Sequence, residues 1–178
     1  MSPPVGSIFN GDRDREQCEL TTPIENYALI GDCLAAALVS RNGSIDWLCW
    51  PSFDSEACFA APLGNERHGR WKISPAGSLR VSRRYRPGTL ILETTFTSDD
   101  GEAVLVDFMP PRDGGSNLVR IVRGVRGTMR MRLDLVVRFG SGFNVPWVRT
   151  LKDGTWHAVA GPDMLTLRTP VALHGVTA

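Results

Sequence analysis

The sequence predicts an all-β protein with the architecture of an antiparallel β-sandwich. Eighteen glycines and twelve prolines among 178 residues indicate many turns, and therefore many short elements. Short apolar segments recur between these turn signals, as in proteins built from several short strands. Residues 129–139 alternate apolar and polar side chains, which is the pattern of a strand with one face in the core and one in water.

The N-terminal part of the chain divides into a tail, a hairpin and a short helical stretch. Residues 1–22 are polar and aperiodic, which predicts a flexible tail. Residues 34–40 and 44–50 are expected to pair, because Asn42-Gly43 tolerates the positive φ angles of a tight hairpin turn. A short helix is expected near 55–61, which Pro62 limits to one or two turns.

Turn residues also separate the later strands. Residues 89–96 and 102–109 meet across Ser98-Asp99-Asp100-Gly101, which predicts a second hairpin, and Gly161-Pro162-Asp163 divides the last two strands. The other strands are expected at 69–74, 79–85, 117–125 and 128–139. In the last of these, the residues expected inward are Met131, Leu133, Leu135 and Val137, and those expected outward are Arg130, Arg132 and Arg138.

Composition and charge narrow the functional classes. Hydrophobic residues make up 42% of the chain and charged residues 22%, as in ordinary globular proteins. The net charge of +1 argues against a nucleic-acid or membrane partner, which would need a concentrated basic surface. The N-terminus lacks the apolar segment of a secretory signal, and no apolar run is long enough to cross a bilayer. A cytoplasmic protein is therefore expected.

The cysteines and histidines do not form a recognisable ligand pattern. The residues concerned are Cys18, Cys33, Cys49, Cys58, His68, His157 and His174. The cysteines contain no C-x-x-C pair, and the histidines lie far from them in the sequence. We expect buried or half-buried free thiols, with no metal and no cofactor.

The segment 42–59 is the candidate functional region, because it gathers aromatic side chains around Asp46 and Asp54. Sugar hydrolysis needs two carboxylates, apolar walls can raise a carboxyl pKa, and aromatic rings stack on sugar faces. The alternative is structural. Aspartate is common in turns, and Asp54-Ser55 has the pattern of a helix N-cap.

Several segments resemble the N-terminal domain of bacterial trehalase-like and glucoamylase-like proteins of glycoside hydrolase family 15. The most specific are GSIDWLCWPSFDS at 43–55 and DFMPPRD at 107–113, and the resemblance runs in order from 23 to 171. It implies a β-sandwich of the supersandwich kind. In that family the sandwich precedes a helical (α/α)6 barrel, where two glutamates hydrolyse α-glucosidic bonds with inversion. The sequence departs from the family pattern at Asn26, Ser52 and Ser141.

The resemblance implies a non-catalytic accessory or docking domain of an inverting α-glucoside hydrolase. Because the barrel is absent from these residues, no catalytic residue is carried over, and 23–178 is expected to be a sandwich truncated before its last strands. The expected partners are the helical catalytic domain, α-glucosides and a second copy of the chain.

Two alternatives remain open. One is a stand-alone carbohydrate-binding module that uses Trp47, Trp50 and Trp147, and the other is an enzyme built on Asp46 and Asp54. The residues expected at an interdomain or sugar-proximal surface are Asp46, Trp47, Trp50, Pro51, Phe53, Asp54, Met109, Pro110 and Trp147. Those expected in contact with water are Trp50, Phe53, Met109 and Trp147. Trp47 and Cys49 share a strand face and are interpreted either as core or as interface.

Overall fold

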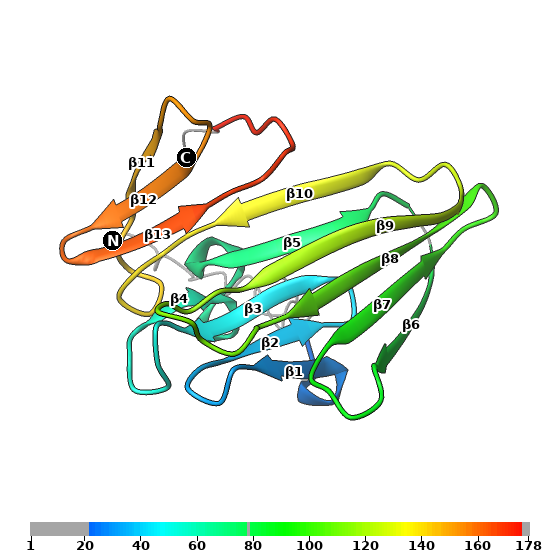
Figure 1. The fold of residues 1–178 in the computed structure, drawn as a ribbon, viewed down its shortest axis with the longest axis horizontal. Coiled ribbons are helices and arrows are strands. Elements are labelled where there is room, and N and C mark those ends of the chain that lie inside the picture. Colours follow the sequence, from blue (N-terminus) through cyan, green and yellow to red (C-terminus); the bar gives the residue numbers. More distant parts are fainter. Residues whose placement is uncertain (1–21, 78, 176–178) are drawn as a thin grey trace, which may run out of the picture.

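The chain folds into three antiparallel sheets, two of which stack as a sandwich (Figure 1). The structure, a computed structural model, describes residues 22–77 and 79–175. Sheet A has the strand order β1-β2-β3-β5-β10, with β4 also paired to β3, and sheet B has the order β6-β7-β8-β9. Sheet C is the smaller meander β11-β12-β13. The predicted all-β sandwich is confirmed.

The strands are short, as the density of turn signals predicts. Sheet A contains β1 (Tyr27–Gly31), β2 (Ala36–Ser40), β3 (Ser44–Cys49), β4 (Ala57–Ala60), β5 (Arg70–Pro75) and β10 (Met131–Val136). Sheet B contains β6 (Arg80–Tyr85), β7 (Leu92–Thr97), β8 (Gly101–Phe108) and β9 (Val119–Gly127). Sheet C contains β11 (Trp147–Thr150), β12 (Trp156–Ala160) and β13 (Asp163–Leu167). Three single 3-10 turns are η1 (Ile24–Asn26), η2 (Ala61–Leu63) and η3 (Glu66–His68).

The predicted hairpins are present at the turns that the sequence marks. The β2–β3 turn contains Gly43, whose φ is 79° and where an added Cβ atom would lie 2.4 Å from the Ile73 carbonyl oxygen. Only glycine fits a position with this φ and this close approach. In the β7–β8 turn, the Ser98 amide donates to the Gly101 carbonyl at 2.9 Å. The β12–β13 hairpin turns at 161–162.

Two hydrophobic clusters form the core. The larger consists of Ile30, Ala35, Ala37, Val39, Ile45, Leu48, Cys58, Phe59, Leu92, Met109 and Phe139. The smaller consists of Ile73, Phe96 and Leu105. Both clusters take residues from sheets A and B, so burial of these side chains holds the sandwich together. Sheet C attaches to the larger cluster through Ala160 and Leu165.

The register predicted for residues 129–139 is confirmed. Met131 and Leu133 pack on the smaller cluster, and Leu135 and Val137 pack on the larger one. The outward side chains Arg130 and Arg132 are exposed, whereas Arg138 is half-buried. The apolar face of β10 is only half-buried because β10 pairs with β5 alone and lies at the edge of sheet A.

The helix expected near 55–61 is wrong. Ala57–Ala60 forms strand β4, which pairs with β3 and is buried at all four positions. This arrangement places Cys58 and Phe59 in the larger cluster, and the burial outweighs a weak local helical preference. The Asp54-Ser55 pair consequently caps no helix. Both residues belong to a turn in which the Ser55 amide donates to the Ser52 carbonyl at 3.1 Å.

A buried ion pair links the two sheets of the sandwich. Arg120 Nε on β9 donates to Asp107 Oδ1 on β8 at 2.8 Å, and both side chains are fully buried. The same guanidinium donates to the carbonyl oxygens of Trp71 and Gly43 in sheet A. It also lies over the Trp71 ring, 5.3 Å from the centroid. Burial raises the pKa of the Asp107 carboxyl, and the Arg120 charge acts in the opposite direction.

The described cysteines are free thiols. Cys58 is buried and Cys49 is half-buried, but Cys33 is exposed in the β1–β2 turn, contrary to expectation. The predicted tail and Cys18 fall on residues 1–21, which lie outside the described residues. In the part of the chain that the structure describes, no helix is long and apolar enough to cross a membrane.

Candidate functional site

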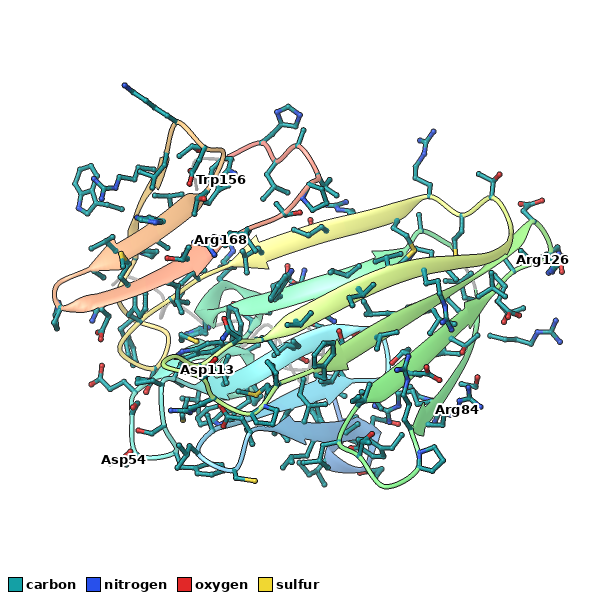
Figure 2. The ribbon with its side chains drawn as sticks, in the orientation of Figure 1. Asp54, Arg84, Asp113, Arg126, Trp156 and Arg168 are labelled. Carbon is teal, nitrogen blue, oxygen red and sulfur yellow. The ribbon has the colours of Figure 1, made fainter. Side chains whose placement is uncertain are left out.

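Three loops are tied together at one end of the sandwich, and we call them the loop cluster. They are the β1–β2 turn (32–35), the β3–β4 loop (50–56) and the β8–β9 loop (109–118). Figure 2 shows Asp54 and Asp113, from two of these loops, toward the same end of the molecule. The candidate segment chosen from the sequence is therefore only one of three contributors to the site.

Arg112 is the residue that joins all three loops. From the β8–β9 loop, its Nε donates to Asp32 Oδ2 in the β1–β2 turn at 2.7 Å. Its Nη2 donates to the Pro51 carbonyl oxygen in the β3–β4 loop. The amide of Phe53 in that loop also donates to the Leu34 carbonyl at 2.9 Å. These contacts fix the position of the β3–β4 loop at both its beginning and its middle.

Asp32 is the acceptor at the centre of this network. Its side chain is fully buried and accepts from the amides of Leu34 and Ala35 at 3.0 and 2.8 Å. Ser116 Oγ donates to Oδ2 at 3.1 Å. Burial opposes ionisation of this carboxyl, but the hydrogen bonds from Arg112 and these donors outweigh it and lower the pKa to about 2. Asp32 therefore acts as an ionised structural acceptor.

The loop cluster presents apolar side chains at its surface. Phe53 is 62% exposed and Leu34 is 53% exposed, and their loops are joined by the backbone hydrogen bond described above. Trp50, at the start of the same loop, instead packs against the larger core cluster. The loop is thus anchored by one aromatic residue and exposes another. Phe53 and Leu34 therefore form an exposed apolar tip on loops that hydrogen bonds hold in place.

Asp46 is a buried structural residue on β3. Its Oδ2 accepts from the Tyr27 hydroxyl at 2.9 Å and its Oδ1 accepts from Ser44 Oγ at 2.5 Å. Burial, followed by the nearby Asp46 carboxylate, raises the pKa of Tyr27 to about 12. Asp46 is 7% exposed, and each of its oxygens accepts from a local hydroxyl group, so this carboxyl is held inside the domain.

Asp54, unlike Asp46, lies at the surface. It is exposed, and a hydrogen bond from Ser52 Oγ at 2.5 Å lowers its pKa. A general acid near neutral pH needs the opposite change. Asp46 and Asp54 also share no hydrogen-bond partner among the described residues. Asp46 is thus a buried hydrogen-bond acceptor, and Asp54 is an exposed turn residue.

The remaining predicted site residues are scattered over the molecule. Trp47 and Cys49 are half-buried and lie outside both core clusters. Leu48, which lies between them in the sequence, is fully buried. Met109 is 6% exposed within the larger cluster, so its predicted exposure is wrong. The residues also named for this surface are placed as follows: Pro51 is exposed, Pro110 is half-buried, and Trp147 is 88% exposed on β11 in sheet C.

No local sequence pattern predicts the hydrogen-bond network that holds the loop cluster. Asp32 and Arg112 are 80 positions apart, and no local pattern connects them. A weak signal existed for each, because Asp32 opens a turn and Arg112 belongs to the motif DFMPPRD. In residues 22–77 and 79–175, no three His, Cys, Asp or Glu side chains gather closely enough to hold a metal ion.

Comparison with known proteins agrees with the motif resemblance. The family profile described as "Trehalase-like, N-terminal" matches residues 14–175, which is most of the chain. The chain belongs to the trehalase-like N-terminal domain family. This assignment includes both of the motifs that the sequence marks as most specific.

Relatives named trehalase match the chain over part of its length. A trehalase of Mycolicibacterium smegmatis is 41% identical over 86 residues, covering 48% of this chain and 13% of the relative. Trehalase 2 of Sulfolobus acidocaldarius is 33% identical over 129 residues, covering 72% of this chain and 21% of the relative. A Mycobacterium tuberculosis trehalase is 33% identical over 132 residues, covering 63% of this chain and 19% of the relative. The chain thus spans about a fifth or less of these relatives. No solved structure gives a significant match.

Proposed function

We propose that this trehalase-like N-terminal domain is a non-catalytic accessory domain that docks on the catalytic region of an α-glucoside hydrolase. The proposed enzyme class is the trehalase or glucoamylase type of glycoside hydrolase family 15, whose catalytic region is a helical barrel. One observation carries the proposal. The Asp32–Arg112 network holds an exposed apolar tip, Phe53 with Leu34, in a fixed position at the end of the sandwich.

The geometry of the tip supports docking to a protein. Binding to a mobile loop costs conformational entropy, whereas a loop already held in place avoids that cost. Here the β3–β4 loop is held by hydrogen bonds to two other loops and by Trp50 in the core. An exposed aromatic side chain on such a support is typical of the residues that dominate binding energy at interfaces. The homology to trehalases, in which the matched region makes up about a fifth of the relative, supplies the class of partner.

The carboxylates argue against a self-sufficient glycosidase. Hydrolysis of a glycosidic bond uses two carboxyl groups on either side of the bond, one of them with a raised pKa. Asp46 is buried and accepts from two local hydroxyl groups, and the pKa of the exposed Asp54 is lowered. These environments support an accessory role for this part of the protein.

A carbohydrate-binding module is the second candidate, and one observation favours it. Trp147 is 88% exposed on β11, so its ring is accessible to a sugar face. The other two tryptophans of this hypothesis give less support, because Trp50 packs against the core and Trp47 is half-buried. The module would therefore depend on one aromatic residue in sheet C.

Activity and glucan binding separate these candidates. We expect the purified chain to leave trehalose, maltose and isomaltose unhydrolysed above the buffer rate, and to show no retention on starch. Retention that disappears in Trp147→Ala would favour the binding module. Turnover that disappears in Asp46→Asn or Asp54→Asn, in variants that still fold, would show that the accessory proposal is wrong.

A further inference from the structure

Among the residues that the structure describes, the outer edge of β9 is the longest unpaired strand edge of the sandwich. Strand β9 spans Val119–Gly127 and ends the order of sheet B, where it pairs only with β8 among the described residues. Seven of its nine residues are exposed, including Ile121, Val122 and Val125. Residues 119–124 pair with β8 in one continuous register, before a bulge at Val125, and an exposed edge with free N–H and C=O groups is a template for pairing with another strand.

On the opposite side of the sandwich, side chains of β6 form hydrogen bonds to backbone groups of sheet A. Tyr85 on β6 accepts from the Leu29 amide at 2.9 Å and donates to the Leu29 carbonyl at 2.8 Å, so it occupies part of the β1 edge. Arg83 on the same strand donates to the Val39 carbonyl at 3.1 Å. Side chains of sheet B therefore satisfy backbone groups of sheet A on that side. No corresponding bonds cover the β9 edge within the described residues.

The side chains of β9 fit a second copy of the same strand. Because Asp107 faces Arg120 across the β8–β9 ladder, Arg120 and Val122 point toward the interior of the sandwich, whereas Ile121 and Arg123 point outward. Two antiparallel copies keep both faces continuous when the pairing centres on one residue. When the pairing is centred on Ile121, Arg123 of one copy faces Val119 of the other copy. When the pairing is centred on Val122, Arg123 of one copy faces Ile121 of the other copy. Neither register places like charges directly opposite, which would be unfavourable.

We propose that two copies of this chain associate through antiparallel pairing of their β9 edges, joining two four-stranded B sheets into one. The dimer has a two-fold axis perpendicular to the sheet. The net charge of +1 opposes association very little.

The test compares two lysine substitutions of matched exposure. Ile121→Lys places a charge at the centre of the proposed interface, and Leu90→Lys places one in the β6–β7 turn, at residues that are 48% and 47% exposed. Light scattering after size-exclusion chromatography at micromolar concentrations gives the molar mass of each. Hydrogen exchange of the β9 amides locates the contact. Circular dichroism establishes that both variants fold.

The expected result is a mass twice 19.5 kDa for the unmodified chain and for Leu90→Lys, and a monomer for Ile121→Lys. The β9 amides should exchange more slowly as the unmodified chain is concentrated. A monomer at every concentration overturns the proposal. So does a dimer that survives Ile121→Lys with fast-exchanging β9 amides, because that dimer uses another surface such as Trp147 in sheet C. The docking tip at Phe53 lies in the loop cluster and not on β9. A monomer or a dimer in this experiment therefore does not decide the proposed function, which has a separate test.

Discussion

At the residue scale, two charged pairs organise the part of the molecule that the structure describes. Asp32 with Arg112 fixes the loop cluster, and Asp107 with Arg120 joins the two sheets. The sequence pattern instead indicated Asp46 and Asp54 as candidate site residues, because both lie among aromatic residues in one segment. It could not find the pairs, because Asp32 meets Arg112 only once the β1–β2 turn and the β8–β9 loop are brought together.

Acid sensitivity of the fold should depend on Asp32. Its pKa is about 2 in the folded protein, below the ordinary value of 3.8, so the ionised form stabilises the fold. This contribution is fully present above about pH 4 and is lost as the pH falls through about 2. In Asp32→Asn, the decline in unfolding free energy over this window should be shallower than in the unmodified chain.

Urea unfolding at pH values from 2 to 5 measures this difference, with Asp113→Asn as a control. Asp113 is an exposed aspartate of the β8–β9 loop with no salt bridge in the described structure. Parallel pH curves for Asp32→Asn and the unmodified chain would contradict the role assigned to Asp32.

Removal of the buried cation should be far more costly. Arg120→Ala leaves the Asp107 carboxyl buried without its partner, and loss of one member of a buried ion pair typically costs about 3–5 kcal/mol. The control Arg123→Ala removes an exposed arginine from the same strand and should cost about 0.5 kcal/mol or less. Urea unfolding at neutral pH gives both values. Equal costs for the two variants would mean that Arg120 does not join the sheets.

At the scale of elements, the turn residues predicted the hairpins. The conformation of segment 55–61 and the assignment of strands to sheets depend instead on tertiary contacts. Gly43 and the Ser98–Gly101 turn determine their own conformations, so these turns were predictable. The segment 55–61 has no strong local preference, and its pairing with β3 made it a strand. The passages from β5 to β6 and from β9 to β10 change sheets, and turn residues do not reveal such a change.

Strand β10 offers a direct test of the predicted register. Leu133 faces the smaller core cluster and Arg132 faces water. Leu133→Ala should lower the unfolding free energy by about 2 kcal/mol, at the low end for leucine because the side chain is half-buried. Arg132→Ala should change it by about 0.5 kcal/mol or less. The reverse order, measured by thermal or urea unfolding, would indicate a one-residue shift that exchanges the two faces.

At the scale of the whole molecule, the fold class was predictable because apolar alternation and turn spacing repeat along the chain. The candidate site was predictable only in part. The β3–β4 loop does expose Phe53, but Met109 entered the core, and Trp147 lies on a separate sheet. A surface formed by three loops depends on how strands far apart in sequence are placed, and that information is not present in any one segment.

In the proposed function, the loop cluster docks this domain on a catalytic region. The most direct measurement is the affinity of the purified chain for the M. smegmatis trehalase relative without its matched N-terminal segment, determined by isothermal titration calorimetry. The trimmed relative must first show the circular dichroism of a folded protein. We predict a one-to-one complex that weakens at least tenfold, or about 1.4 kcal/mol, in Phe53→Asp and is unchanged in Trp147→Ala. No binding, or binding that Trp147→Ala abolishes and Phe53→Asp leaves intact, would contradict the claim.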